Sequence, residues 1–174
     1  MEKAENVTEN GGENTQEKRY FAKVLWGGLL KSRKSAALPG AKIYPPTLTN
    51  SDLANIKIAN EMGVTGVMQP FVRDHSDLER VKEVLREAGA EDIRLFAKIE
   101  NMDGVRKLEK LLPAADEIVI ARGDLGNAVH LWDLPGVQRQ ISEKCRAAGK
   151  PFMVVTQMLA SMERSPCPDP CGGK

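Results

Sequence analysis

The stretch from Leu95 to Gly126 constrains the fold most, because two short apolar runs there flank a segment of helical period. Both runs are rich in β-branched or bulky side chains: Ile93, Leu95 and Phe96, then Ile118, Val119 and Ile120. Between them, apolar residues recur at Val105, Leu108, Leu111 and Leu112. This pattern predicts a strand, a helix and a second strand, the repeating unit of parallel α/β folds.

Polar side chains follow both predicted strands. Lys98 and Glu100 lie at the end of the first strand, and Asp124 follows the second. Ligands of parallel α/β folds bind beyond the carboxyl ends of the strands, so we expect these three side chains at one functional edge. An ammonium group and two carboxylates together indicate a divalent metal with oxygen ligands, beside a cation that faces an anionic substrate.

The chain on either side repeats the alternation of strands and helices. We expect strands at 64–70, up to Lys98, up to Ala121 and at 152–156. The expected helices begin at two capping boxes, Thr49 with Asp52 and Ser76 with Glu79, and continue at about 104–112 and in a segment that ends at Gly149. The four strand–helix periods, each of roughly 25 to 35 residues, amount to about half of a (β/α)₈ barrel.

Charge and hydropathy exclude two classes of protein. The formal net charge is +1, from 25 Lys and Arg against 24 Asp and Glu, so a nucleic-acid or acidic-membrane surface is not expected. No apolar run approaches the roughly 20 residues of a membrane span, and the first residues lack the apolar core of a signal peptide. We therefore expect a soluble, cytoplasmic protein.

The three cysteines do not predict a disulfide framework or a zinc site. Cys145 falls on the apolar stripe of a predicted helix, where it acts as a small hydrophobic residue. Cys167 and Cys171 would need two further ligands, and the only histidines, His75 and His130, lie far away in the sequence. The methionines at 68, 102, 153 and 158 are expected to fill the core.

Three segments together resemble the pyruvate kinase family. Residues 97–101 (AKIEN) and 120–126 (IARGDLG) are similar to the signature pair of that family, and 155–162 (VTQMLASM) is similar to the segment after its next strand. The resemblance extends from about Val24 to Met162, in the order and spacing of the family.

The resemblance implies a glycolytic phosphotransferase, in which phosphoryl passes from phosphoenolpyruvate to ADP and the resulting enolate is protonated to pyruvate. Catalysis then rests on positioning and on stabilisation of negative charge. By the same resemblance Glu100 and Asp124 are the protein ligands of Mg²⁺ or Mn²⁺. Lys98 lies beside the phosphoryl and enolate oxygens.

The resemblance also assigns backbone groups to the substrate. The N–H groups of Ala121, Gly123 and Asp124 face the substrate carboxylate, because small residues let the main chain approach an anion closely. Thr156 hydrogen-bonds the same end of the substrate. Arg122 is either an anion contact or, as we favour, an ion-pairing residue that organises the loop.

Four regions follow from this assignment. They are a disordered arm at 1–19, a β-hairpin remnant of the lid domain at 20–40, a partial barrel with about strands 4 to 7 at 41–163, and an irregular tail at 164–174. In the tail the family pattern breaks off, as in a truncation or a shifted reading frame. The first three strands of the family supply the phosphoryl and K⁺ ligands, so K⁺ is expected but has no ligands here. The family is usually homotetrameric. We expect this chain to be inactive alone and to depend on a complementary half barrel.

Two alternatives remain open at this stage. A metal-dependent aldolase or lyase of the phosphoenolpyruvate and pyruvate class also places a glutamate and an aspartate on neighbouring strand ends. Lys98, two residues before the glutamate, argues against this class. The other alternative is a non-catalytic interaction fragment, because a half barrel exposes two strand edges.

Overall fold

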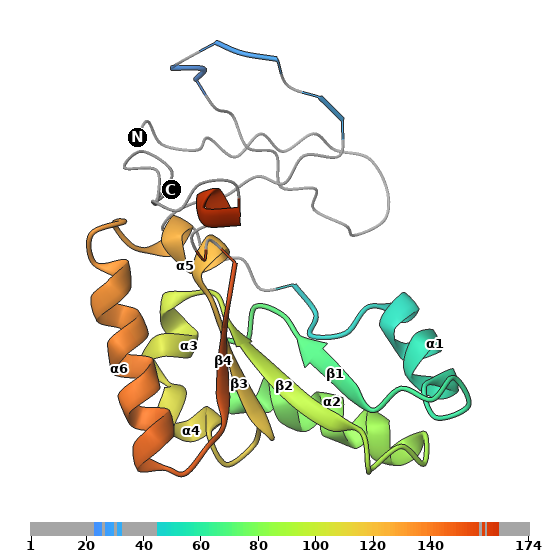
Figure 1. Cartoon of the computed structure of the whole chain (residues 1–174). Coiled ribbons are helices and arrows are strands. Elements are labelled where there is room, and N and C mark those ends of the chain that lie inside the picture. Colours follow the sequence, from blue (N-terminus) through green and yellow to red (C-terminus); the bar gives the residue numbers. More distant parts are fainter. Residues whose placement is uncertain are drawn as a thin grey trace, which may run out of the picture. The chain divides into compact units, whose positions relative to one another are not determined.

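The computed structural model describes residues 23–25, 27–29, 31–32, 45–156, 158 and 160–163. The chain divides into two compact units, Met1–Ala36 and Ala37–Lys174. Helices and strands alternate along the second unit (Figure 1). Its elements are α1 (Asn50–Ile58), β1 (Gly66–Gln69), α2 (His75–Glu87), β2 (Arg94–Ile99), α3 (Met102–Arg106), α4 (Leu108–Leu111), β3 (Glu117–Ala121), α5 (Arg122–Ala128), α6 (Leu134–Ala147), β4 (Phe152–Val155) and a 3₁₀ turn (Ala160–Glu163).

The four strands form one parallel sheet in the order β1-β2-β3-β4. Val67 lies opposite Leu95, and Ala97 lies opposite Ile118. Strands that are consecutive in the sequence are thus neighbours in the sheet, and helices connect them, as the alternating pattern predicts. The expected α/β class and all four expected strands are confirmed.

The hydrophobic core lies between one face of the sheet and a layer of helices. Helix α2 packs against β2 and α6 against β3, while α4 contacts both α2 and α6 (Figure 1). The strand residues on this face are almost fully buried: Leu95, Ala97, Ile99, Ile118 and Ile120. On α6, Ile141 and Cys145 are buried as expected, and burial raises the pKa of the Cys145 thiol.

The opposite face of the sheet carries the alternate residues of the strands. Met68 lies opposite Phe96, and Lys98 lies opposite Val119. Met68 is 53% exposed, so its expected place in the core is wrong, because it points away from the helices. Met158 is also exposed, at 54%. No helix in the described part of the chain is long and apolar enough to cross a membrane.

Aspartates take part in the capping of α1 and α2, but at α2 they are not the residues that the sequence predicts. Thr49 and Asp52 form the expected capping box at α1. At α2 the predicted box of Ser76 with Glu79 is wrong: Asp74 is the N-cap and Asp77 is its reciprocal partner. The reason is that the side chain of Asp77 accepts the N–H of Asp74, which starts the helix one residue before Ser76.

The helix expected at 104–112 is interrupted at Lys107. Its four apolar residues are buried as predicted, but Val105 belongs to α3, Leu108 and Leu111 to α4, and Leu112 is the C-cap of α4. Asn101 caps the first helix by accepting the N–H of Gly104, and Lys107 reaches Asp74 at 2.7 Å. The hydrogen bond from Lys107 lowers the pKa of Asp74, and the bond to His75 lowers it further. The helix is therefore interrupted at the residue, Lys107, whose side chain bonds the N-cap of α2.

Little of the first unit is described. The expected arm at 1–19 and the tail at 164–174 lie outside the described residues. Of the predicted hairpin, residues 23–25, 27–29 and 31–32 are described, and none of these is in a strand. Val24 and Leu29 are 78% and 85% exposed, and a hairpin without a buried face is only marginally stable.

Two glycines provide a matched test of the packing. A Cβ on Gly104 would lie 2.7 Å from the carbonyl oxygen of Val72, whereas a Cβ on Gly136 in α6 meets nothing within 4 Å. We expect Gly104→Ala to lower the free energy of unfolding by about 1–3 kcal/mol. Gly136→Ala should raise it by up to about 1 kcal/mol, because alanine favours the helix. Urea denaturation measures both, and equal effects would contradict the described packing.

We expect Asp77 to make the free energy of unfolding depend on pH in the acid range. Burial pushes the pKa of Asp77 up, but hydrogen bonds from Arg73 and Thr47 outweigh it, so the pKa lies below its ordinary value. Such a group stabilises the fold above its unfolded pKa of about 3.9, and that contribution is lost as the pH falls through the lower folded pKa.

We therefore expect Asp77→Asn to destabilise the fold by about 1–3 kcal/mol at neutral pH and to flatten the fall in stability below about pH 4. Thermal unfolding at several pH values measures this. Asp92→Asn, at an exposed position, is the control. An identical acid dependence in wild type and Asp77→Asn would rule the explanation out.

Candidate functional site

The carboxyl ends of β2, β3 and β4 lie side by side. Ile99 is opposite Ile120, and Ala121 is opposite Val155. Glu100, Arg122 and Thr156 each follow directly after one of these strands. The sheet therefore brings three segments that are far apart in the sequence to one edge, the one at which parallel α/β folds bind ligands.

Glu100 is the most buried charged residue at this edge. Its side chain is 0% exposed, and its Oε2 accepts the N–H of Phe71 at 2.7 Å. The Nζ of Lys98 lies 2.6 Å from Oε1, and the Lys98 side chain is 26% exposed. Residues two apart on an extended chain point to the same side, which places this pair away from the helical core. Because the Glu100 side chain is fully buried, its contact with Lys98 is not a solvated surface ion pair.

The carboxylate of Glu100 is suited to a further cation. Oε1 is buried, and among the described residues it is paired with the ammonium of Lys98 at 2.6 Å. Asp124 lies in the first turn of α5, after the neighbouring strand, and is exposed. Among the described residues no three or more Asp, Glu, His or Cys side chains gather at one point. Mg²⁺ commonly takes one or two protein carboxylates and completes its shell with water and substrate oxygens, so this donor set fits it.

Two residues with a left-handed backbone lie at this edge. Phe71, two residues after β1, has φ of 50°, and Thr156, directly after β4, has φ of 63°. This conformation is rare for aromatic and β-branched residues and costs about 1–3 kcal/mol, so the surrounding structure must impose it. Each of the two makes a hydrogen bond to a predicted site segment: Phe71 to Glu100, and Thr156 to Gly123. Such strain typically marks functional sites.

Gly123 and Thr156 are joined directly. The Oγ1 of Thr156 accepts the N–H of Gly123 at 2.8 Å, and a Cβ on Gly123 would lie 3.0 Å from that oxygen. The sequence predicts that the Gly123 N–H faces a substrate, whereas here it is engaged by Thr156. Ala121 ends β3 and is 2% exposed. The run from Arg122 to Ala128, treated in the sequence as a loop, is the short helix α5.

Arg122 bonds a neutral partner. Its Nη1 donates to the Oε1 of Gln138 in α6 at 3.1 Å, and it makes no ion pair with any described carboxylate. The predicted ion-pairing role is therefore not seen within the described residues. By contrast Arg73 pairs with Asp77 at 2.9 Å.

Sequence reasoning missed Phe71 and gave Asn101 no role. Asn101 donates to the carbonyl of Val72 at 3.1 Å and so holds the segment that carries Phe71. The sequence signal for Asn101 was its place directly after Glu100, before a predicted helix. Phe71 gave no signal, because a left-handed phenylalanine cannot be recognised from residue type.

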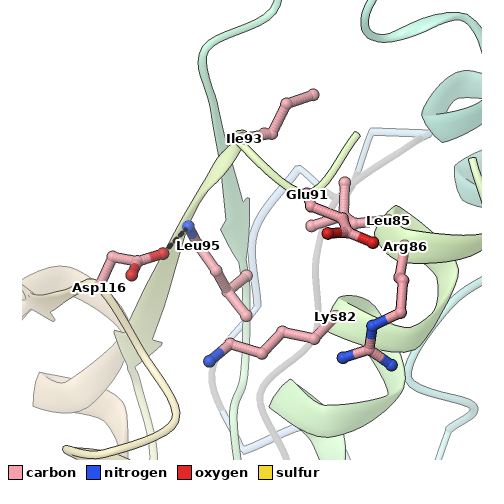
Figure 2. A pocket seen from close by; sticks show the side chains of 7 residues that line it. All are labelled: Lys82, Leu85, Arg86, Glu91, Ile93, Leu95 and Asp116. Carbon is pink, nitrogen blue, oxygen red and sulfur yellow. Dashed lines mark hydrogen bonds between the residues drawn. The ribbon is translucent and has the colours of Figure 1, made fainter. Parts of the chain in front are cut away.

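A hollow of about 230 Å³ lies at the other edge of the sheet (Figure 2). Lys82 and Arg86 of α2 line it together with Glu91 and Asp116, over an apolar floor. Asp116, just before β3, accepts the N–H of Leu95 at 2.6 Å, the bond drawn in Figure 2. This hollow lies near the amino ends of the strands and its charges are of both signs. It is therefore separate from the candidate site.

Comparisons with known proteins agree with the motifs. The family model described as pyruvate kinase, barrel domain, matches residues 8–171. A pyruvate kinase of Bacillus licheniformis is 38% identical over 155 residues, covering 89% of this chain and 26% of the relative. Those of Geobacillus stearothermophilus and Dictyostelium discoideum are 40% and 39% identical, covering 83% and 80% of this chain and 25% and 27% of the relatives. The chain thus spans about a quarter of the length of the curated relatives it matches.

Substitutions at Phe71 test the link between its backbone and Glu100. We expect Phe71→Gly to change the free energy of unfolding by less than about 1 kcal/mol, because relief of strain offsets the greater freedom of the unfolded chain. Phe71→Pro should lower it by about 3 kcal/mol or more, because proline fixes φ near about −65° and removes the N–H. Denaturant unfolding measures both. A proline variant as stable as the glycine variant would show that this N–H does not hold Glu100.

Proposed function

The chain belongs to the pyruvate kinase family, and we propose that it carries the metal-binding and enolate-facing half of a phosphotransferase site. In the proposed reaction the bond between phosphorus and the enol oxygen of phosphoenolpyruvate breaks, and a bond from phosphorus to a terminal oxygen of ADP forms. The enolate left behind takes a proton and becomes pyruvate. As a glycolytic step, this reaction places the protein in the cytoplasm.

The observation that carries the proposal is the buried carboxylate of Glu100, with Oε2 held by the N–H of Phe71 and Oε1 paired with the ammonium of Lys98 at 2.6 Å. Glu100 and Asp124 would hold Mg²⁺ or Mn²⁺. Such an ion, when bound, neutralises negative charge on the phosphoryl and enolate oxygens. A carboxylate that is already desolvated and fixed in orientation needs little rearrangement to serve as a ligand.

Lys98 supplies the positive charge for the substrate. Its Nζ lies beside Glu100, and its partial exposure leaves the ammonium group accessible from the sheet edge. There it stabilises the anionic phosphoryl group and then the enolate oxygen. The low polarity around a partly buried ammonium strengthens this interaction relative to water.

Thr156 orients the carboxylate end of the substrate. Because its Oγ1 accepts the N–H of Gly123, the hydroxyl hydrogen is free to be donated to an anion. The left-handed backbone of Thr156 holds that hydroxyl against α5. The same bond ties the segment that carries Asp124 to the end of β4.

We further propose that the four described strands correspond to about strands 4 to 7 of a (β/α)₈ barrel, and that 20–40 is a remnant of the lid. Edge strands β1 and β4 and the exposed Met68 on the face away from the helices support this. In a barrel that face points inwards. The phosphoryl and K⁺ ligands of the family lie on strands outside this chain. We propose that the 174-residue chain is inactive alone and depends on a complementary half barrel; the homotetramer usual in the family is a separate proposal.

Calorimetric titration of Mn²⁺ into the full 174-residue chain, with and without oxalate as an enolpyruvate mimic, tests the metal half-site. We expect oxalate to tighten Mn²⁺ binding. Glu100→Gln should weaken it by about tenfold or more, because loss of a metal ligand, or of a group that orients one, typically costs that much. Glu87→Gln, at an exposed position at the end of α2, is the matched control.

Equal Mn²⁺ affinity in wild type and Glu100→Gln would sink the metal assignment. Pyruvate formation from phosphoenolpyruvate and ADP at enzyme-like rates by the chain alone would instead contradict its dependence on a second half. Cleavage of a 4-hydroxy-2-oxo acid without phosphoryl transfer would favour the aldolase alternative.

A further inference from the structure

A second hollow, of about 340 Å³, lies where α5 and α6 meet and is lined by Arg122, Pro135, Gln138, Arg139, Ser142 and Arg146. We call it the arginine hollow. Five of these residues belong to α6, and Arg122 is the first residue of α5. Gln138, Ser142 and Arg146 follow one another at intervals of four along α6, so they lie on one face of the helix.

The lining of the arginine hollow is positively charged and lacks a compensating carboxylate. Three guanidinium groups line it, and no Asp or Glu does. Within the described residues none of the three arginines makes an ion pair, whereas Lys144 on the same helix pairs with Glu109 at 2.9 Å. In the hollow at the other edge of the sheet, by contrast, Glu91 and Asp116 balance the cations. Three like charges around one hollow repel one another unless an anion lies between them.

Neighbouring contacts hold two of the three arginines in place. Gln138 accepts Nη1 of Arg122, and the guanidinium of Arg146 lies over the ring of Phe152, 5.6 Å from its centre. The Nε of Arg122 is buried and has no hydrogen-bond acceptor in the described part of the chain. A buried donor without a partner is costly, and an oxyanion bound by Arg122 would supply an acceptor if the side chain turns its Nε toward the hollow.

We propose that the arginine hollow binds a small oxyanion with at least two negative charges, of the phosphate or polycarboxylate class. Guanidinium groups bind such oxygens in pairs of parallel hydrogen bonds, which distinguishes them from chloride. Arg122 immediately precedes Gly123, whose N–H bonds Thr156. An anion held by Arg122 therefore restrains the start of α5 next to the candidate site. The proposal does not rest on the phosphotransferase assignment.

The test uses the full chain and follows the Nε–H resonance of Arg122 by NMR, assigned by its loss in Arg122→Lys. Sodium phosphate and, separately, sodium citrate are titrated at constant ionic strength, with sodium chloride as the reference. We expect a saturating shift with at least one of the two anions and none with chloride. The tighter of the two identifies the ligand as phosphate-like or as a polycarboxylate.

Paired variants decide whether the hollow is responsible. Arg139→Gln with Arg146→Gln should weaken binding by about tenfold or more, as expected when hydrogen bonds to a charged group are lost. Arg80→Gln with Arg106→Gln removes the same charge from exposed residues that have carboxylate partners, and should change affinity less than about twofold. Both positions in the first pair are exposed, so the variants should fold, which thermal unfolding checks.

Three results would overturn the proposal. The first is a shift that does not saturate or that chloride reproduces. The second is equal weakening by the two pairs of variants, which would indicate general charge attraction. The third is a dimer in sedimentation that is insensitive to phosphate and citrate and is lost in Arg139→Gln with Arg146→Gln, because the arginines would then form a contact between protein chains.

Discussion

The bond from the Phe71 N–H to the buried carboxylate of Glu100 connects the fold to the candidate site. A carboxylate that is removed from water must be satisfied by donors or by positive charge, or it takes up a proton instead. One of its oxygens is satisfied by backbone and the other lies beside Lys98. This arrangement fixes the segment after β1 against the end of β2.

Strain and hydrogen bonding act together at this edge. The left-handed backbones of Phe71 and Thr156 are unfavourable locally, and each is retained where its N–H or hydroxyl bonds a neighbouring segment. Asn101 adds a further tie by holding Val72 and capping α3. The segments that follow β1 and β4 are thus fixed by the strands beside them. Such ties hold the segments around the candidate site in one arrangement, as the proposed catalysis by positioning and charge requires.

The order of strands and helices could be read from the sequence, because hydrophobic period is a local property. Short apolar runs rich in β-branched or bulky side chains, at 93–96 and 118–120, and the apolar stripe of the helix that ends at Gly149 predicted elements that the structure contains. Boundaries that depend on neighbours were less accurate. The start of α2 was missed because Asp74 and Asp77 cap it reciprocally in place of Ser76 and Glu79. The interruption at Lys107 was also missed, and the bond from Lys107 to Asp74 that coincides with it joins residues 33 apart.

The sequence by itself determined which residues follow which strand, and so placed Lys98, Glu100, Asp124 and Thr156 at one edge of a parallel sheet. It also determined the family, since those motifs are short and contiguous. Only the tertiary structure decided that Glu100 is buried, that Gly123 bonds Thr156 and that three arginines share one hollow. The physical reason is separation: Phe71 and Glu100 are 29 residues apart, and Gly123 and Thr156 are 33 apart. Contacts over such distances depend on how strands pair and helices pack, which no local pattern encodes.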